Sequence, residues 1–577
     1  MKKKLLPALI VTGLIILVVI IMGITALINK YTPTKKTEDL KEYFNISSDD
    51  EAALIVDNEL SDYKAKIIDK KIYVDYKFVH DSLNSRFYWD ANENVLLYTT
   101  ASDIISAAAD SNSYSVTKQT NDFGYPIVKA TSDSALIALD YVKQYSNITF
   151  KSYDDPARIV ITSKWDEIDS ATVSKPTQVR VKGGIKSPIL KEVKKDDKIT
   201  ILDSGDKWDK VATEDGVIGY IKRKALSESK KTKLTNPDYE EETFTHIKKD
   251  KDICLAWNQV TSQSANSKVP QVISSTKGIN VMSPTWFYLN DNNGNLADIA
   301  SKDYVSYCHS QGIEVWGLFS NLENTDVDAA YVLTHTSTRT TLINQIMSAA
   351  FNYELDGVNI DFENITEAAY GDSYIEFIRE LSIKCHNNGI SLSVDVTVPA
   401  SFNKFFNRSD MAKFADYIVI MGYDEHYKGS DAGSVSSIPW VTEGVESTLK
   451  EVPADQIILG MPFYTRIWEL TPKEDDDAVT DTEDQSKYTV ASQVYSMDAA
   501  AAQLATNNAT AALDEESGQN YAEWSVSNKL YKVWLEDSTS LEKRLKLVDD
   551  NKLAGAAFWK LGFENSSVWD TVIKYLN

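Results

Sequence analysis

The sequence is poor in the residues that build disulfide frameworks and metal sites. Its 577 residues include only three cysteines, Cys254, Cys308 and Cys385, and six histidines. Three scattered cysteines are too few for a disulfide scaffold or a zinc site, and the histidines show no metal-ligand spacing, so we expect no metal and no cofactor. Positive charge is also scarce, since 60 lysines and arginines face 84 aspartates and glutamates, a net charge of −24. Nucleic-acid binding depends on cations that neutralise phosphates, so we expect no nucleic-acid partner.

Only one long apolar run is present, and it lies at the N-terminus. The lysines of Lys2–Lys4 precede an apolar stretch over residues 5–28. As a helix this stretch would span about 36 Å, enough to cross a bilayer core of about 30 Å. The lysine cluster favours a cytoplasmic N-terminus. We therefore expect residues 1–30 to form a cytoplasmic tip and an anchor, making a single-pass protein of the cell membrane with its catalytic domain outside the cytoplasm. The alternative is a cleaved signal peptide, whose apolar core is usually shorter, roughly 7–15 residues.

The rest of the chain has the composition of folded domains, and its length suggests about three or four of them. Residues 40–165 alternate strand-like and helical stretches. The segments KIYVDYKFVHDSL and RFYWDANENVLLYTT place apolar residues at alternate positions, whereas SALIALDYVKQYS has helical spacing. This pattern resembles the N-terminal domain family of copper amine oxidases, which implies a small α+β module without copper chemistry.

Residues 172–228 read as a compact all-β unit. Five short strand-like runs are separated by turns rich in glycine, aspartate and lysine. The unit resembles a bacterial Src-homology-3-like domain, with Val179 and Arg180 at its start, Trp208 in its middle, and Gly219 and Tyr220 before its last strand. The resemblance implies a small β-barrel that binds cell-wall peptide; a simple spacer is the alternative.

From residue 247 to residue 577 strands and helices alternate. Eight strand candidates are DICLAWNQV, GINVMSPTWFYL, IEVWGLFSN, LDGVNIDFEN, ISLSVDVTVP, ADYIVIMGYDEH, QIILGMPFYTRIW and LAGAAFWKLGF. Several are continuous apolar runs, as expected for parallel strands buried on both faces. We therefore predict a C-terminal (β/α)8 TIM barrel with a small α+β insertion at about residues 470–530. The acidic run KEDDDAVTDTEDQ in this insertion is expected to be a solvated loop rather than a metal site.

The fourth strand candidate carries three polar residues at alternate positions. Side chains alternate along a strand, so Asn359, Asp361 and Glu363 point to one side, and Val358 and Ile360 to the other. In a barrel the polar set faces the lumen, with Glu363 at the carboxyl end, where barrel enzymes place their catalytic groups. Two neighbouring carboxylates raise one another's pKa, which keeps one of them protonated as a general acid.

The segment DGVNIDFE, which begins at Asp356, resembles the DGxDxDxE signature of glycoside hydrolase family 18, the chitinase-like family. The resemblance implies that Glu363 protonates the glycosidic oxygen. It also implies that Asp361 orients the N-acetyl group of the substrate, which acts as nucleophile in place of a protein carboxylate. The segment MGYD, from Met421 to Asp424, matches the family's M-x-Y-D, and Tyr423 would hydrogen-bond the acetamido group.

Further positions follow from the same resemblance. Trp559, in AAFWKLGFE, stands where the family keeps a tryptophan as the floor of the −1 sugar subsite. GMPFYTRIW resembles the family's seventh strand, with Tyr464 and Arg466 as sugar contacts. Asp356, Asn359, Met421 and Asp424 are assigned to substrate binding.

One position departs from the family pattern. Asn359 stands where chitinases usually have an inner aspartate, so the lumen is expected to hold one carboxylate fewer. Together with the segment SPTWFYL and the module of wall-binding type, this asparagine makes the sequence more similar to the spore-cortex and peptidoglycan N-acetylglucosaminidase branch than to secreted chitinases.

The leading hypothesis is thus a membrane-anchored glycosidase that hydrolyses β-1,4 bonds of N-acetylglucosamine-containing polysaccharide by retaining, substrate-assisted catalysis. The alternatives are a non-catalytic glycan-binding protein on a chitinase-like barrel and a wall-binding anchor whose barrel activity is incidental. The sequence leaves open chitin or peptidoglycan as the substrate, and endo or exo cutting.

Overall fold

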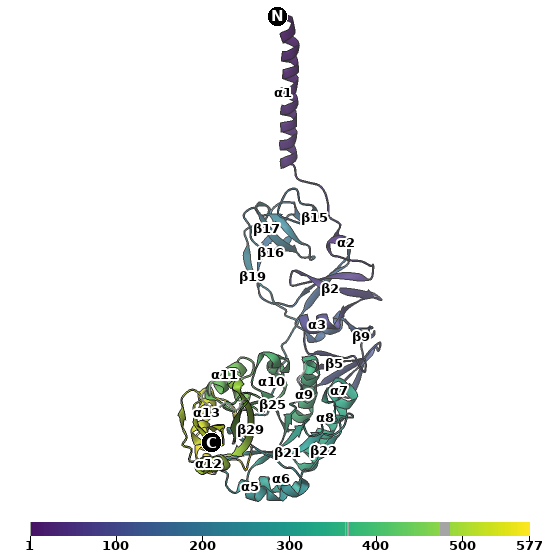
Figure 1. The fold of residues 1–577 in the computed structure, drawn as a ribbon. Coiled ribbons are helices and arrows are strands. Elements are labelled where there is room, and N and C mark those ends of the chain that lie inside the picture. The colour runs from purple at the N-terminus through teal and green to yellow at the C-terminus, as the bar shows by residue number, and fades with distance from the viewer. Residues whose placement is uncertain (1, 364, 366–367, 474–484, 577) are drawn as a thin grey trace. The chain divides into compact units, whose positions relative to one another are not determined.

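The computed structural model describes residues 2–363, 365, 368–473 and 485–576 (Figure 1). The chain divides into two compact units. The first comprises residues 1–89, 107–114 and 121–241, and the second comprises residues 90–106, 115–120 and 242–577.

The chain begins with α1 (Lys2–Tyr31), which makes no buried contacts from residue 7 onward. Its segment Pro7–Tyr31 has a mean hydropathy of 2.9. By length and composition this helix could cross a membrane, a property that it shares with signal sequences near an N-terminus.

The first unit contains a seven-stranded mixed sheet in the order β11-β12-β1-β2-β3-β10-β9. Its strands are β1 (Glu51–Val56), β2 (Glu59–Ile68), β3 (Lys71–Asp75), β9 (Val128–Ala130), β10 (Ala135–Ala138), β11 (Thr149–Tyr153) and β12 (Arg158–Thr162). The helices of this region are α2 (Leu40–Tyr43), α3 (Tyr76–Ser82) and α4 (Leu139–Tyr145). A further sheet has the order β4-β5-β6-β7-β8, and its strands are β4 (Phe87–Asp90), β5 (Val95–Thr99), β6 (Ile104–Ala108), β7 (Ser113–Val116) and β8 (Gln119–Asp122). Residues of this last sheet are divided between the two units.

A second seven-stranded sheet of the first unit has the order β15-β14-β18-β17-β16-β13-β19. Its strands are β13 (Glu167–Thr172), β14 (Thr177–Arg180), β15 (Ile189–Val193), β16 (Lys198–Asp203), β17 (Trp208–Thr213), β18 (Ile218–Lys222) and β19 (Lys230–Lys233). Val179, Val211 and Ile221 are buried in its apolar core. The short strands β14–β18 lie within residues 172–228, and β13 and β19 extend the sheet beyond them.

The second unit is built on a closed barrel of eight parallel strands. They are β20 (Ile253–Asn258), β21 (Val281–Leu289), β23 (Glu314–Ser320), β24 (Gly357–Asp361), β25 (Ser391–Thr397), β26 (Tyr417–Met421), β27 (Ile457–Pro462) and β33 (Gly555–Trp559). The barrel closes because β20 pairs with both β21 and β33. A short strand, β22 (Leu296–Asp298), adds to β21 in antiparallel orientation. The predicted (β/α)8 barrel is confirmed, and each of the eight predicted segments contains one of its strands.

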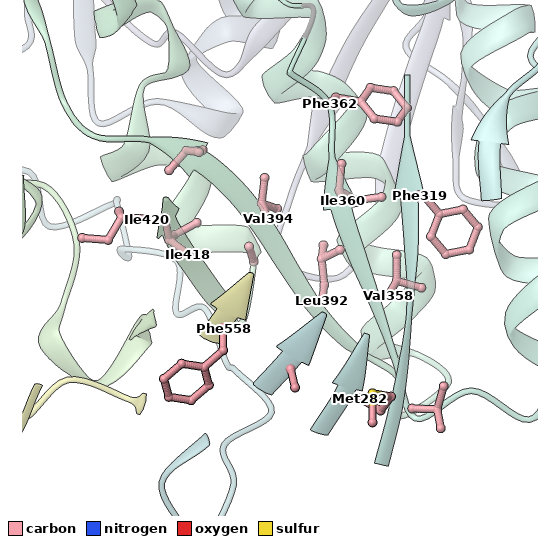
Figure 2. Close-up of a cluster of buried hydrophobic side chains, with 14 of the residues drawn as sticks. Met282, Phe319, Val358, Ile360, Phe362, Leu392, Val394, Ile418, Ile420 and Phe558 are labelled. Atoms are coloured by element: carbon pink, nitrogen blue, oxygen red, sulfur yellow. The ribbon is translucent and has the colours of Figure 1, made fainter. Parts of the chain in front are cut away.

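Side-chain alternation separates the two faces of the barrel wall. Val358 and Ile360 of β24 and Leu392 and Val394 of β25 join the large apolar cluster outside the barrel (Figure 2). This layer is covered by the helices of the barrel, which are α5 (Val269–Ile273), α6 (Lys302–Ser310), α7 (Ala329–Thr334), α8 (Thr336–Tyr353), α9 (Gly371–His386), α10 (Arg408–Phe414), α11 (Ile438–Thr448), α13 (Ser538–Asn551) and α14 (Val568–Val572). A separate, smaller apolar cluster lies inside the barrel and includes Trp257.

Residues 90–106 contact the barrel helices within the second unit. Asp90 accepts hydrogen bonds from the backbone N–H and the hydroxyl of Thr336, both 2.6 Å, at the start of α8. A carboxylate in this place caps the helix and complements its dipole. Thr99 donates a buried hydrogen bond of 2.8 Å to Glu376 of α9. Part of the segment expected to form an N-terminal module therefore packs as part of the barrel unit.

A five-stranded sheet is inserted between β27 and β33, in the order β29-β28-β32-β31-β30. Its elements are β28 (Tyr464–Pro472), β29 (Tyr488–Ser496), α12 (Met497–Thr506), β30 (Ala512–Asp514), β31 (Gln519–Val526) and β32 (Lys529–Leu535). The predicted small α+β insertion is thus present. The acidic run predicted to be a solvated loop lies, over residues 474–484, outside the described residues.

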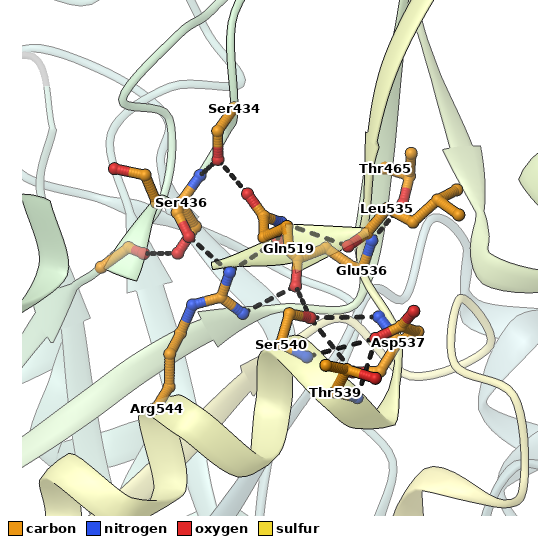
Figure 3. A network of polar contacts seen from close by, with 12 residues as sticks. Ser434, Ser436, Thr465, Gln519, Leu535, Glu536, Asp537, Thr539, Ser540 and Arg544 are labelled. Carbon is orange, nitrogen blue, oxygen red and sulfur yellow. Dashed lines mark hydrogen bonds and ion pairs between the residues drawn. The ribbon is translucent and has the colours of Figure 1, made fainter. Parts of the chain in front are cut away.

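A buried ion pair joins the insertion to the barrel (Figure 3). Arg544 of α13 and Glu536, which follows β32, are 2.6 Å apart, and both side chains are 0% exposed. Gln519 donates to Glu536 at 2.8 Å, and Arg544 also donates to the carbonyl of Ser436. The Ser436 hydroxyl in turn donates to the carbonyl of Gly422. This network connects the insertion with the loop that follows β26.

We expect Arg544→Met to lower the free energy of unfolding by about 3–5 kcal/mol, because it leaves the Glu536 carboxylate buried without its cation. Urea unfolding followed by tryptophan fluorescence measures this loss. The matched control is Lys546→Met on the same helix, whose ion pair with Asp550 is solvent-exposed and should matter little. Equal midpoints for the two variants would contradict the importance of the buried pair.

Candidate active site

Asn359 lies at the centre of a polar cluster inside the barrel, and its side chain is 0% exposed. Its amide oxygen accepts hydrogen bonds from Trp257 Nε1 at 3.0 Å and from Ser283 Oγ at 2.9 Å. Its amide nitrogen donates to Ser393 Oγ at 3.0 Å and to Asp395 Oδ1 at 2.7 Å. A primary amide has two donors and two acceptor positions, and here all four are used. Asn359 therefore acts on the site through its neighbours, with no hydrogen-bonding capacity left for a substrate.

Asp361 is the next inward residue of β24. Burial, above all, raises the pKa of Asp361 well above its ordinary value, and the nearby charges of Asp395 and Glu363 raise it further. Its Oδ1 atom is buried and has no hydrogen-bond partner among the described residues. An unpartnered carboxyl oxygen at this depth leaves Asp361 able to bond a substrate or a shared proton.

Asp395 of β25 is a lumen carboxylate that the sequence analysis did not identify. Its side chain is buried, and burial raises its pKa well above the ordinary value, although the hydrogen bond from Asn359 acts in the opposite direction. The lumen therefore does not lack a second inner carboxylate, because Asp395 supplies one from the neighbouring strand. The signal was available in SLSVDVT, where Ser391, Ser393 and Asp395 alternate with apolar residues as the polar positions of β24 do.

Glu363 lies two residues beyond Asp361, just after the end of β24, and reaches solvent at the mouth of the barrel. Partial desolvation by the surrounding protein raises the pKa of Glu363, and the charges of Asp424 and Glu323 raise it further. Glu323, which follows β23, was also not singled out in the sequence. Glu363 and Asp395 line one cavity of about 150 Å³, with Phe362, Ile365, Val396, Thr397, Phe402, Asn403, Phe405, Phe406 and Met421.

The loop after β26 brings a tyrosine to the same carboxylates. The Tyr423 ring lies 6.4 Å from the ring of Trp257 and 6.2 Å from that of Tyr464, between centroids. Burial raises the pKa of Tyr423 well above its ordinary value, and the neighbouring negative charges of Asp361 and Asp395 add to the rise. The phenol is therefore held neutral as a hydrogen-bond donor near the Asp361 carboxyl.

Other predicted positions also lie at this mouth. Tyr464 of β28 donates a hydrogen bond to Asp424, and the Arg466 guanidinium lies 3.8 Å from the same carboxylate. The Trp559 ring, at the end of β33, lies 6.0 Å from that of Trp257, and the two ring planes meet at 65°.

Asp356 is the predicted site residue that the structure places elsewhere. It precedes β24, at the opposite end of the strand from Glu363. Its carboxylate accepts a hydrogen bond of 2.8 Å from the Val315 backbone and lies 2.8 Å from His309 Nε2. These contacts fix the start of β24 against β23, because a carboxylate there satisfies an N–H at the end of the parallel ladder.

The comparisons with known proteins agree with this geometry. Residues 324–564 match the model of the glycosyl hydrolases family 18. The barrel belongs to glycosyl hydrolase family 18. This match supports a glycosidase as the enzyme class of the barrel.

Two bacterial relatives share part of the sequence. The uncharacterized glycosylase YvbX of Bacillus subtilis is 24% identical over 302 residues, which are 49% of this chain and 81% of that protein. The cortical fragment-lytic enzyme of the same organism is 24% identical over 287 residues, 48% of this chain and 63% of that protein. The match thus covers less than two thirds of the second relative. The solved spore cortex-lytic enzyme SleL of Bacillus cereus shares the fold, with a TM-score of 0.50 and 18% identity over 60% of this chain and 79% of that one.

Proposed function

We propose that this chain is a membrane-anchored, extracytoplasmic glycosidase that hydrolyses β-1,4 bonds of N-acetylglucosamine-containing glycans, either peptidoglycan or chitin-like. The observation that carries the proposal is the placement of Glu363. Its carboxyl reaches the mouth of a family 18 barrel, has a raised pKa, and lies two residues after a buried carboxyl on the same strand. A protonated carboxylic acid at this place is a proton donor suited to a leaving oxygen.

The reaction that fits these groups has two steps. In the first, Glu363 gives its proton to the glycosidic oxygen while the acetamido oxygen of the substrate attacks C1, so that the C1–O bond breaks and an oxazolinium ion forms, which keeps its N–H. In the second, Glu363 takes a proton from a water molecule whose oxygen attacks C1, so that the oxazolinium ring opens and the neutral acetamide is restored. Two displacements at the same carbon retain the β configuration.

Asp361 and Tyr423 assist by holding the acetamido group. The unpartnered Oδ1 of Asp361 would accept the acetamide N–H, and the neutral Tyr423 hydroxyl would donate to its oxygen. Fixing a nucleophile against the reacting carbon removes much of the entropic cost of the attack. The half-buried ring of Trp559 would support the apolar face of the sugar ring.

The second candidate function is a non-catalytic glycan-binding protein on the same barrel. It needs the sugar contacts but no proton donor. The presence of Glu363, with a raised pKa and in reach of the cavity, favours hydrolysis.

We also propose that residues 172–228 bind cell-wall peptide, with a spacer role as the alternative. A cavity of about 370 Å³ beside β17 and β18 supports this proposal. Within residues 172–228 it offers Lys210 for a charged group and Tyr220 for an apolar one, and Glu59 of β2 lines its other side.

We expect Glu363→Gln to reduce hydrolysis of N-acetylglucosamine oligomers and of purified peptidoglycan by about 10²–10⁴-fold, because it keeps the shape and removes the proton donor. Products are separated and identified by mass. The control is Glu446→Gln on the exposed face of α11, which should keep full activity. Binding without hydrolysis by the wild-type chain would favour the non-catalytic alternative.

Because the acetamido group of the substrate acts as the nucleophile, the reaction requires an N-acetyl group at C2. We expect glycans with a free amine at C2 to remain uncleaved, whereas their N-acetylated counterparts of equal length are cut. Proton NMR during the reaction should first show the β-anomer. An α-anomer as first product, or equal cleavage of both glycans, would rule out attack by the acetamide.

The anchor proposal rests on α1, and the expected result is recovery of the intact chain with the membrane fraction after washing at high salt. Protease added to intact cells should then degrade the barrel. A chain without residues 1–30 is the control and should be released. A mature form that begins after α1 would show a cleaved signal peptide instead.

A further inference from the structure

Asp395 is a buried carboxyl to which the two-step mechanism assigns no role. It lines the same cavity as Glu363, although it comes from a different strand. A buried carboxyl that served only to fill space would be replaced by an apolar residue at lower free energy. Its contacts therefore indicate what it does.

Asn359 fixes Asp395 and accounts for the amide at its own position. Its nitrogen donates to Asp395 at 2.7 Å, whereas its oxygen is held by the Trp257 indole N–H, which can only donate. The side-chain amide of Asn359 therefore cannot flip, that is, exchange the positions of its oxygen and nitrogen. An ionised aspartate at position 359 has no proton to donate, so the amide is the form that suits a carboxylate at Asp395.

Asp361 and Asp395 face the same lumen, and the two carboxyls differ in their support. Asp395 receives a hydrogen bond that stabilises its ionised form, whereas Asp361 Oδ1 has no partner among the described residues. Two buried carboxyls that repel one another bind one proton between them over a wide pH range. Asp395, which receives the hydrogen bond, therefore keeps the negative charge, and Asp361 keeps the proton.

We propose that Asp395 is a positioning residue that acts through Asp361: held ionised by Asn359, it keeps Asp361 protonated in the unliganded chain. The expected effect on the reaction rate rests on the proposed function. The expected protonation of Asp361 does not, because it concerns the unliganded chain alone.

Other ionisable groups set the background for any titration. Those that interact with the pair itself are Glu323 after β23, Glu363 after β24, Tyr374 on α9 and Tyr423 after β26. Further out, Asp424 after β26 interacts with Glu363, and Tyr464 and Arg466 on β28 lie next to Tyr423 and to one another. Most of these groups are acidic, so the removal of one carboxylate lowers the proton affinity of those that remain.

The first measurement needs no catalysis. Desolvation raises the pKa of both Asp361 and Asp395 in the folded chain, so this pair binds more protons in the folded than in the unfolded state, and its contribution to stability falls as the pH rises above about 4. Asp395→Asn removes one carboxyl and lowers the pKa of the other. We therefore expect the melting temperature of Asp395→Asn, relative to the wild type, to increase steadily from pH 5 to pH 8. A difference that is constant with pH would show a merely structural role and overturn the proposal.

The second measurement is the pH profile of kcat/KM on an N-acetylated oligomer. We expect Asp395→Asn to move the alkaline limb to lower pH by about one unit, because Glu363 and Asp361 lose a repelling charge. Asn359→Asp adds a carboxylate and should move the limb to higher pH. The exchange Asn359→Asp with Asp395→Asn restores one carboxylate and one amide, and its limb should return close to that of the wild type.

The matched control is Asp416→Asn, which removes a buried carboxylate that directly precedes β26 and accepts a hydrogen bond of 2.8 Å from the backbone of Leu392 in β25. Its alkaline limb should stay in place. Unchanged limbs in both single variants, Asp395→Asn and Asn359→Asp, would overturn the proposal. A wild-type chain without hydrolytic activity would instead overturn the proposed function, while the stability measurement would still decide the protonation of Asp361.

Discussion

The saturated amide of Asn359 is the interaction on which the site depends. It connects four strands of the barrel, because its partners lie on β20, β21 and β25 while it belongs to β24. The cluster is fully enclosed, so each polar group must find a partner within the protein. With its four bonds made, the amide fixes the height at which Asp361 and Asp395 stand in the lumen. Glu363 follows from the same register, two residues further along the strand.

The mouth of the barrel concentrates negative charge at a cost in stability. Asp395 is buried, Asp361 is half-buried with an enclosed Oδ1 atom, and the charges of Glu363 and Glu323 act on Asp361, so that proton binding is the way in which the site reduces repulsion. The stability needed to hold such a site comes from elsewhere in the unit. The apolar layer between strands and helices supplies most of it, and the Arg544–Glu536 pair connects the inserted sheet to this frame.

Much of the barrel could be predicted from the sequence. Parallel strands buried on both faces leave continuous apolar runs, so all eight were visible, and the alternation in DGVNIDFE already set Asn359, Asp361 and Glu363 apart from Val358 and Ile360. Two kinds of error had a common origin. Asp395 was overlooked, and Asp356 was grouped with the site although it lies at the far end of β24. In each case the sequence motif was followed along a single strand. The height of each residue in the barrel, and its neighbour on the adjacent strand, were left out of account.

The sequence by itself determined the order of the barrel strands, the direction in which each side chain points and the presence of a proton donor at the end of the fourth strand. These properties are local, because they follow from the two-residue period of a strand and from hydrophobic burial. Only the tertiary structure decided that Asp395 meets Asn359 and that residues 90–106 join the barrel unit through α8 and α9. Such contacts join residues 36 and more than 240 positions apart, and no periodicity in the chain encodes which distant partners a closed barrel will bring within hydrogen-bonding distance.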